Sequence, residues 1–305
     1  MSQIRVAVLR GGPSSHYEDS LLTGGTILKH LPEQYIPQDI FISKEGTWHY
    51  GGLPITPHKV FQNTDVVLNA LHGTYGEDGT LHETLDIFEP DYSGSDRLAH
   101  KVAGNRVLLK KVYRAHGLKT PYAALVSREG DFDQKVNELF RTFPLPAQFS
   151  SAKRFVPEAK LEHAKDFSSL RSSLEKLFET EEQVIAEEHI PGRIALCGVL
   201  EGFRGQKLYS FLPAELVGEK LTYPSVFSEA QKKEIGDLAR KAHEVLGARH
   251  YSLSFFVVHP KRGVYILETR LLPPLSPESH FGEFLKHVGS SISEFLEHLI
   301  GLVKK

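Results

Sequence analysis

A histidine close to a glycine-rich turn is the first feature of this sequence that could do chemistry. His72 follows the apolar run Val66–Leu71, and the turn Gly76–Thr80 lies just beyond it. Open α/β sheets bind ligands beyond the carboxyl ends of their strands, and a turn that opens a helix presents N–H groups to an anion. The pattern favours a pocket for a small polar ligand. Two simpler interpretations stay open: a histidine bonded only to backbone, and glycines that serve only the turn geometry.

Carboxylates at the ends of two later apolar runs form a second group. Glu187 and Glu188 end the run Gln183–Glu188, and Glu268 ends the run Val264–Glu268. Carboxylate oxygens bind Mg²⁺, but this ion prefers octahedral coordination and usually has several anionic partners. Glu268 alone therefore predicts a poor magnesium site. Paired glutamates at the end of a strand are usually just solvated.

The elements that must position these side chains begin with an alternating pattern. Apolar runs typical of strands occur at Ile4–Leu9, Ile36–Ile42 and Val66–Leu71, and a helix is expected over Tyr17–His30. Strands separated by helices indicate a parallel α/β sheet in the first hundred residues. This arrangement places His72 at the end of a strand.

The rest of the chain mixes further strands and helices. The clearest element is the helix after Ser228, because Ser228 and Gln231 have capping-box spacing and Gly247 is a natural stop. We divide the chain into units 1–97, 98–182 and 183–305. Other expected elements are strands at Tyr122–Val126, Leu145–Phe149, Tyr251–Val258 and Val264–Glu268, and helical segments at Asn105–His116, Asp166–Phe178 and Phe281–Leu302.

Composition excludes several classes of protein. The 305 residues are 40% hydrophobic and 24% charged with a formal net charge of -2, so the strongly basic face of a nucleic-acid-binding protein is not expected. The single cysteine rules out an intrachain disulfide. No apolar run approaches the length of a membrane span, and the start lacks the pattern of a signal peptide. We expect a cytoplasmic protein with no nucleic-acid or membrane partner.

Several segments, in order along the chain, carry a family resemblance. The segments Gly11–Leu21 and Asn69–Leu81 are similar to the two amino-terminal signatures of D-alanine–D-alanine ligases. Tyr92–Ser95 resembles the next signature, and Pro273, Ser276 and Ser279 fall where this family closes its active site. The resemblance covers nearly the whole chain, and its combination of His-Gly with Gly-Glu-Asp-Gly-Thr is specific.

The resemblance implies an α/β fold of the ATP-grasp class: an N-terminal parallel α/β domain followed by two ATP-grasp domains. It also implies a reaction of peptidoglycan precursor synthesis. ATP phosphorylates the carboxylate of one D-alanine, and the amine of a second D-alanine attacks the acyl phosphate. The implied cofactors are ATP and Mg²⁺, and the implied partners are a small amino acid or dipeptide.

The resemblance also assigns roles to residues. Glu18, His72 and Ser279 match positions that bind the amino-acid substrates, although a serine that caps a helix is the simpler interpretation of Ser279. The matches for nucleotide binding are Arg106, Lys110 and Glu187, the last on the adenine side. Glu268 matches one metal ligand.

Other positions depart from the family pattern around the phosphates. Gln148 replaces a phosphate-binding lysine, and Ile194 replaces a ribose-binding glutamate. The loop Ser150–Pro157, which should fold over the phosphates, contains no glycine. Lys153 and Arg154 in this loop could supply substitute charge, but solvated side chains are the simpler interpretation.

The departures continue at the metal and oxyanion positions. On one strand, Leu253 replaces the oxyanion arginine and Phe255 replaces a metal-binding aspartate. On the next, Arg270 replaces an asparagine metal ligand, a cation that would repel Mg²⁺ and could pair with Glu268. Further departures are His16 for a glutamate, Pro274 for a glycine and a shortened mobile loop in the segment Glu215–Pro224.

Three hypotheses follow. A ligase rebuilt around Arg106, Lys110, Lys153, Arg154 and Arg270 predicts ATP binding that depends on magnesium. A non-catalytic binding protein predicts no binding of Mg²⁺-ATP but binding of D-alanine or its dipeptide near His72 and Ser279. A structural protein, for example a homodimer through its N-terminal domain, predicts neither ligand.

Overall fold

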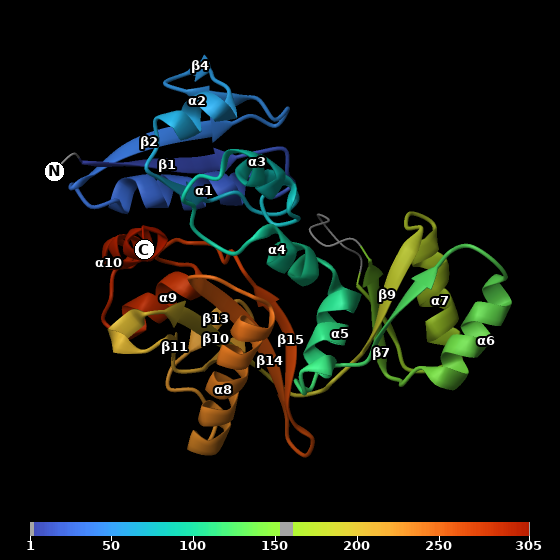
Figure 1. The fold of residues 1–305 in the computed structure, drawn as a ribbon. Coiled ribbons are helices and arrows are strands. Elements are labelled where there is room, and N and C mark those ends of the chain that lie inside the picture. Colours follow the sequence, from blue (N-terminus) through green and yellow to red (C-terminus); the bar gives the residue numbers. More distant parts are fainter. Residues whose placement is uncertain (1–2, 153–160, 305) are drawn as a thin grey trace.

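The computed structural model describes residues 3–152 and 161–304, and these residues form three sheets (Figure 1). The first sheet has the order β4-β3-β2-β1-β5, in which β1 pairs in parallel with β2 and β5. The expected parallel α/β unit is therefore confirmed. Its strands are β1 (Ile4–Gly11), β2 (Tyr35–Ile42), β3 (Trp48–Tyr50), β4 (Leu53–Pro54) and β5 (Val66–Asn69), and its helices are α1 (Tyr17–His30), α2 (Pro57–Gln62) and α3 (Thr80–Phe88).

The second sheet is antiparallel, with the order β6-β9-β7-β8. Its strands are β6 (Ala123–Ser127), β7 (Ala147–Ser151), β8 (Glu162–Ala164) and β9 (Gln183–Glu188). Helices α6 (Phe132–Thr142) and α7 (Phe167–Phe178) cover its outer face (Figure 1). The strand β9, which our division assigned to the third unit, pairs inside this sheet, and the division itself stays a prediction.

The third sheet is built on the long hairpin of β14 (Tyr251–His259) and β15 (Gly263–Arg270), which pairs with β10 (Arg193–Glu201). Helix α8 (Glu229–Val245) covers one face, and the expected capping box of Ser228 and Gln231 is present. The remaining elements are η1 (Phe203–Gly205), β11 (Leu208–Ser210), β12 (Ala214–Val217), β13 (Lys220–Thr222), α9 (His280–His287) and α10 (Ile292–Val303).

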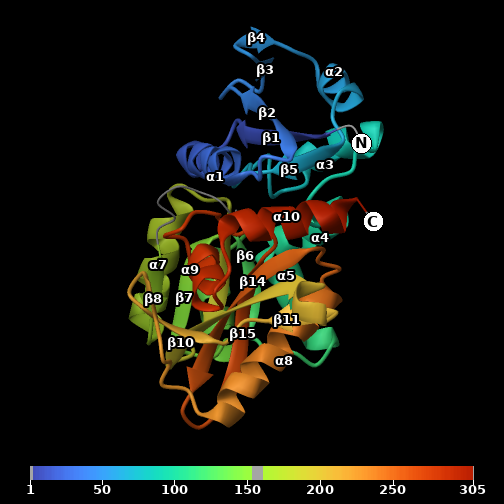
Figure 2. The same cartoon turned by 90° about the vertical axis from the view of Figure 1, so that its left-hand side faces the viewer.

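The first and third units share one hydrophobic core. Val8 and Leu68 of the first sheet belong to the same buried cluster as Phe281, Phe295 and Leu299 of the last two helices. Figure 2 shows α10 lying between the first sheet and the third. Burial of this many apolar side chains fixes the first unit on the third.

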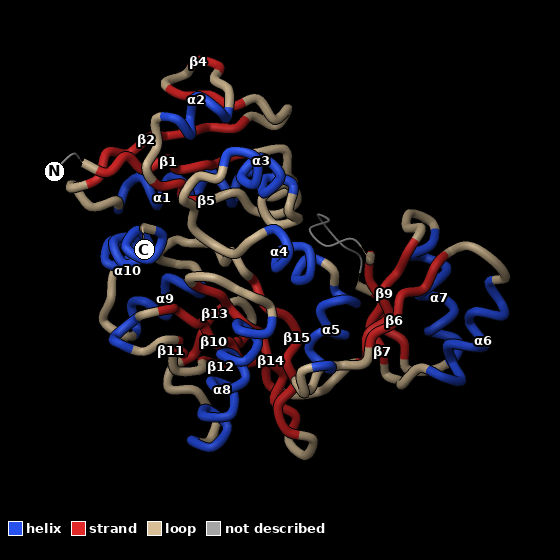
Figure 3. Tube along the Cα trace, in the orientation of Figure 1, coloured by secondary structure: helices blue, strands red, loops and turns tan. Residues whose placement is uncertain are grey.

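The second sheet stands apart from this shared core. Helices α4 (Arg97–Gly104) and α5 (Arg106–Ala115) lie between the second and third sheets (Figure 3). Apolar side chains of both helices pack in the core under α8 rather than in the core of the second sheet. The two sheets therefore face each other across a space that α5 borders.

The segment expected to be a shortened mobile loop is a tight hairpin. Strands β12 and β13 pair antiparallel, and only Gly218 and Glu219 separate them. Gly218 has a φ of 63°, which glycine adopts without strain. Within the described ranges, the helices include none with the length and apolar character needed to cross a membrane.

Candidate functional site

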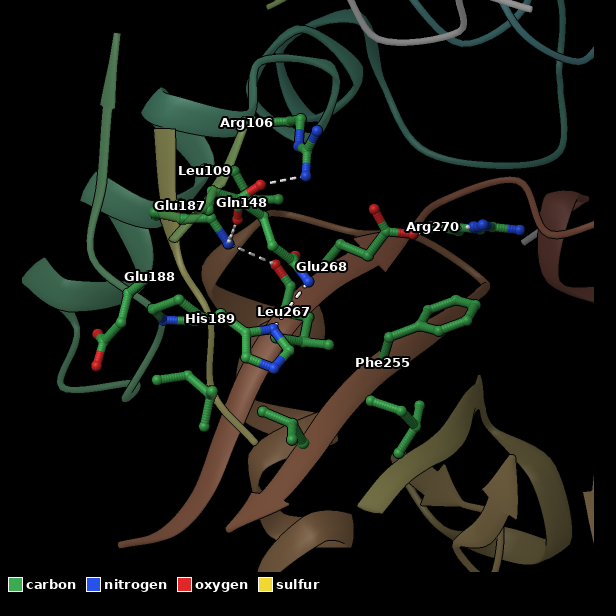
Figure 4. Close-up of a pocket in the computed structure, with 15 residues that line it drawn as sticks. Arg106, Leu109, Gln148, Glu187, Glu188, His189, Phe255, Leu267, Glu268 and Arg270 are labelled. Atoms are coloured by element: carbon green, nitrogen blue, oxygen red, sulfur yellow. Dashed lines mark hydrogen bonds and ion pairs between the residues drawn. The ribbon is translucent and has the colours of Figure 1, made fainter. Parts of the chain in front are cut away.

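A cleft of about 330 Å³ lies between the second and third sheets, with α5 along one side (Figure 4). Its volume is at the lower end of the range for ligand pockets, about 300–1,000 Å³. The residues that line it are Arg106, Leu109, Lys110, Pro121, Gln148, Glu187, Glu188, His189, Ile190, Ile194, Phe255, Val257, Leu267, Glu268 and Arg270. The four residues expected to bind nucleotide and metal (Arg106, Lys110, Glu187 and Glu268) are thus together in one cleft.

The Glu187 carboxylate sits between two cations of the chain itself. Lys110 Nζ lies 2.8 Å from Glu187 Oε1, and Arg106 Nη2 donates to Glu187 Oε2. Lys110 also donates to the Leu267 carbonyl at 3.1 Å. The Lys110 side chain is 3% exposed and the Glu187 side chain 11%. Burial lowers the pKa of the Lys110 ammonium, and the nearby Glu187 carboxylate opposes this shift.

Arg106 ties three elements together at the edge of the cleft. It is the first residue of α5, and its Nη1 donates to Ser150 Oγ on β7 at 2.8 Å while its Nη2 reaches Glu187 on β9. Arg106, which we expected to bind a phosphate, thus donates to Glu187, which we expected to face adenine. An arginine fork suits such a double contact better than an ammonium would.

Gln148 and His189 form a neutral pair in the same cleft. Gln148 Nε2 lies 2.9 Å from His189 Nδ1, so the amide donates and the ring nitrogen accepts. Gln148 brings no positive charge to the cleft, and its amide is used in this contact with a neighbouring side chain. We did not predict a role for His189. In the sequence, His189 directly follows the two glutamates at the end of β9, and this position could have indicated a place in the same cleft.

The residues at the metal position do not fit a magnesium site. Phe255 and Glu268 are directly paired across β14 and β15, and Arg270 Nε lies 3.2 Å from Glu268 Oε1. The Arg270 guanidinium carbon lies 4.7 Å from the centre of the Phe255 ring. No group of three or more metal-binding side chains occurs in the part of the chain that the structure describes. The single carboxylate is neutralised by an arginine, which confirms the predicted pairing.

His72 lies in a different place, at the contact between the first and third units. Its Nε2 is 2.8 Å from Thr23 Oγ1 on α1, and its Nδ1 is 3.7 Å from Glu77 Oε1. Thr23 Oγ1 also accepts from the Leu275 backbone N–H at 3.4 Å. His72 is only 3% exposed. The partners of its ring are therefore side chains, and the simple interpretation of a histidine bonded only to backbone is wrong.

The other residues matched to substrate binding do not line the cleft. Glu18 is exposed in the first turn of α1. Ser279 caps α9: its Oγ accepts from the Gly282 N–H at 3.1 Å and donates to the Ser276 carbonyl at 2.7 Å. The capping interpretation of Ser279 is thus what the geometry shows. The substrate roles of Glu18, His72 and Ser279 stay predictions.

The glycine-rich turn before α3 has a steric reason for its glycines. A Cβ on Gly76 would lie 1.8 Å from the Leu71 carbonyl oxygen, so only glycine fits. Gly79 has a φ of 92° directly before the helix. An anion site at this turn remains a prediction. Lys153 and Arg154 lie outside the described residues.

Comparison with known proteins identifies the family of the chain. The family model described as "D-ala D-ala ligase C-terminus" matches residues 121–301, which is more than half of the chain. The chain belongs to the D-alanine–D-alanine ligase family. It is 28% identical over 316 residues to the D-alanine–D-alanine ligase of Carboxydothermus hydrogenoformans, covering 98% of both chains. It is 29% identical to that of Geobacter sulfurreducens, covering 97% of this chain and 93% of the relative.

Solved structures of this family have the same fold. The D-Ala:D-Ser ligase VanG from Enterococcus faecalis superimposes with a TM-score of 0.86 at 21% identity, covering 99% of this chain and 100% of the other. The Bacillus anthracis D-alanine–D-alanine ligase complexed with ATP superimposes with a TM-score of 0.78 at 22% identity, covering 98% and 96%. The expected ATP-grasp architecture is confirmed.

Proposed function

We propose that this protein serves the peptidoglycan precursor pathway of its family by binding a small amino acid or dipeptide, without performing magnesium-dependent ATP ligation. Its relatives support the ligand class, since they are D-alanine–D-alanine ligases. The observation that carries the proposal is the pairing of Glu268 with Arg270 over the Phe255 ring. A cytoplasmic location and a homodimer are further proposals that depend on the family alone.

The electrostatics of the metal position argue against Mg²⁺-ATP. Mg²⁺ usually needs carboxylates and phosphate oxygens in an octahedral arrangement. Here the one carboxylate already faces a guanidinium, and a second cation beside it would be repelled. The triphosphate would then lack the metal that offsets its charge.

The adenine side presents a second obstacle. The Glu187 carboxylate already accepts from both Arg106 and Lys110 and its side chain is 11% exposed, so an amino group of a base would have to share it with two cations of the chain. Breaking a buried ion pair by removing one partner typically costs about 3–5 kcal/mol. A nucleotide that displaced either cation would have to offset that cost.

The chemistry of the transition state is also unsupported. Leu253 and Pro274 stand where the resemblance implies an arginine and an N–H donor, and proline has no N–H. Loss of one oxyanion donor typically lowers the rate about 10²- to 10³-fold. Two losses together with the metal position leave little ligase activity.

Isothermal titration of the whole protein tests the proposal. ATP is titrated with and without Mg²⁺, beside D-alanine and D-alanyl-D-alanine. We expect heat from D-alanine or the dipeptide and none from ATP in either condition. ATP binding that requires Mg²⁺, followed by phosphate release in the presence of D-alanine, would establish an active ligase instead.

A protein that binds ATP without a metal is the second candidate, distinct from the rebuilt ligase, because three cations, Arg106, Lys110 and Arg270, do line one cleft. They could in principle balance part of a triphosphate without a metal. This candidate predicts ATP binding that is the same in Mg²⁺ and in EDTA. The same titration therefore separates three outcomes: no ATP binding, ATP binding that requires Mg²⁺, and ATP binding that does not.

A further inference from the structure

Four side chains at the old metal position share one face of the third sheet. Leu253 is directly paired with Arg270, and Phe255 with Glu268, across β14 and β15. Directly opposed residues of antiparallel strands point to the same side. A β-bulge follows Phe255, a feature that often re-aims side chains beside functional sites. Arg270 thus brings a guanidinium to a face where β14 carries only apolar side chains.

Arg270 is held in a way that leaves its fork available. Its Nε donates to Glu268 and its guanidinium carbon lies over the Phe255 ring. The two terminal nitrogens have no hydrogen-bond acceptor in residues 3–152 and 161–304. The side chain is 41% exposed and lines the cleft. A stacked and tethered guanidinium loses little further freedom when it binds a carboxylate through both terminal nitrogens.

The charges around the cleft do not cancel. Arg106 and Lys110 share the single carboxylate of Glu187, so this group carries one positive charge in excess. Arg270 and Glu268 balance each other. Glu188 pairs at 2.8 Å with Arg262, which does not line the cleft, and Figure 4 shows Glu188 turned away from the other labelled side chains. The cleft therefore suits a ligand that presents one carboxylate group.

The remaining lining is apolar. Ile190, Ile194, Val257 and Leu267 line the same cavity as Arg270, and they pack together in a small buried cluster. Ile194 replaces a polar residue that would bond ribose hydroxyls, so this surface favours a body without hydroxyl groups. A compact ligand can cover this apolar surface while it presents an anionic group to the arginine.

We propose that Arg270 is a receptor for the carboxylate of a small organic molecule, which binds in this cleft without any metal. The inference deepens the proposed function and depends on it where the ligand is taken to be D-alanine or its dipeptide. The carboxylate binds both terminal nitrogens of Arg270, and Phe255 and Glu268 hold the guanidinium in place. The apolar part of the ligand lies against Ile190 and Ile194.

Titration of D-alanyl-D-alanine into the whole protein in EDTA and in Mg²⁺ is the first test. We expect equal affinity in both buffers and a loss of roughly 10- to 100-fold in Arg270→Gln, the range for a hydrogen-bonded charged group. Arg270→Lys keeps the charge and loses the fork, so it should bind with intermediate affinity. The matched control Arg171→Gln removes an arginine of the same exposure, 41%, on the outer helix α7, and should bind within twofold of the parent. Equal affinity of Arg270→Gln and the parent would overturn the proposal.

A second test needs neither a variant nor a D-alanine ligand. Phenylglyoxal labels accessible arginines, and peptide mass spectrometry reads the labelling of Arg270 and Arg262 separately. Benzoate should protect Arg270 but not Arg262, and uncharged benzamide should protect neither. Protection by benzoate, even where the dipeptide gives no heat, would retain the receptor and reject the proposed D-alanine function. Protection by inorganic phosphate alone, or by no anion, would overturn the receptor.

Discussion

The surroundings of His72 and the cleft around Glu187 stabilise buried polar groups through different kinds of contact. Both are buried polar sites, and we predicted substrate binding at the first and nucleotide binding at the second. Near His72 the close contact is a hydrogen bond of 2.8 Å between the ring and a threonine hydroxyl. In the cleft the close contacts join oppositely charged side chains, as between Lys110 and Glu187. The polar groups of the cleft are therefore paired with charges of the chain itself.

This difference bears on which site a ligand could still enter. A neutral hydrogen bond is worth about 0.5–1.5 kcal/mol net and is readily exchanged for a similar bond to a ligand. A buried charged group must keep a counter-charge, because an uncompensated buried ion is much more costly. The Arg106–Glu187 and Arg270–Glu268 pairs supply such counter-charges within the chain itself.

The largest expected effect comes from removing the shared carboxylate. Glu187→Ala leaves Lys110, which is 3% exposed, with the Leu267 carbonyl as its acceptor among the described residues, next to a second cation. We expect the free energy of unfolding to fall by about 3–5 kcal/mol, measured by urea denaturation. If the cleft instead relied on bound ligand for its charge balance, the loss would be much smaller.

Two further variants serve as a control and a rescue for Glu187→Ala. Glu175→Ala removes a carboxylate from an exposed ion pair with Arg171 and should change the free energy of unfolding by less than about 1 kcal/mol. Lys110→Met in the Glu187→Ala background removes the stranded ammonium. It should restore most of the lost stability, because an apolar replacement for a buried ion pair is often neutral.

The second expected effect is a pH dependence on the His72 side of the comparison. His100 of α4 is 2% exposed, and its ring centre lies 4.5 Å from that of His82. Burial, with a smaller repulsion from His82, lowers the pKa of His100 to about 4, against an opposing contribution from Glu77. The unfolded chain therefore binds a proton between pH 6.5 and 4 that the folded chain does not. Stability is complete above about pH 6.5 and is lost as the pH falls towards 4.

The size of this loss is roughly 3 kcal/mol for His100, from the linkage between pKa and folding. Urea denaturation at pH 7.0 and pH 4.5 measures it. His100→Phe should reduce the dependence by about this amount and leave the part due to His250, whose pKa burial also lowers to about 4. His116→Gln, at an exposed position, should leave the dependence unchanged. An equal slope in the parent and in His100→Phe would show that other groups carry the effect.

Much of the architecture follows from local patterns in the sequence. The helix Tyr17–His30 was predicted with the bounds that the structure shows, and the Ser228–Gln231 capping box was identified from spacing alone. These features depend on neighbours three or four residues apart. The placement of β9 in the second sheet could not be found this way, because strand pairing is decided by partners far along the chain.

The site shows the same limit. Spacing and resemblance identified Arg106, Lys110, Glu187 and Glu268, and the structure places all four in one cleft. The bond between Arg106 and Glu187 joins residues 81 positions apart and was not predicted. Long cationic side chains reach several partners, so their choice depends on which neighbouring charges are buried. His189 and Thr23 were missed because their roles arise only from contacts made in the folded chain.

The third effect tests the hydrogen bonds around His72 directly. Thr23→Val keeps the shape of a side chain that is 4% exposed but removes the partner of His72 Nε2 and, at 3.4 Å, that of the Leu275 N–H. We expect a loss of about 2 kcal/mol in the free energy of unfolding, because a buried imidazole nitrogen and a buried N–H are left without this partner. Thr26→Val on the same helix removes only a bond to the Leu22 carbonyl and should cost less than about 1 kcal/mol. Equal losses in the two variants would mean that the His72 bond has no special weight.

The smallest expected effect tests why the residues around Glu268 do not fit a metal ion. The double variant Phe255→Asp/Arg270→Asn places two oxygen-bearing side chains beside Glu268 on the same face of β14 and β15. Because oxygen ligands on paired strands can converge on one ion, we expect Mn²⁺, measured by electron paramagnetic resonance, to bind at least tenfold more tightly than to the parent. Tenfold corresponds to about 1.4 kcal/mol.

Arg270→Asn alone removes the repelling cation but leaves one carboxylate, so it should gain much less affinity for Mn²⁺ than the double variant. A gain in the double variant would mean that side-chain chemistry alone excludes the ion and that the backbone of β14 and β15 still has the spacing that a metal requires. No gain, in a variant that unfolds with the parent's cooperativity, would place the obstacle in the backbone. The bulge after Phe255 would then be the feature to change next, because it sets the direction of that side chain relative to Glu268.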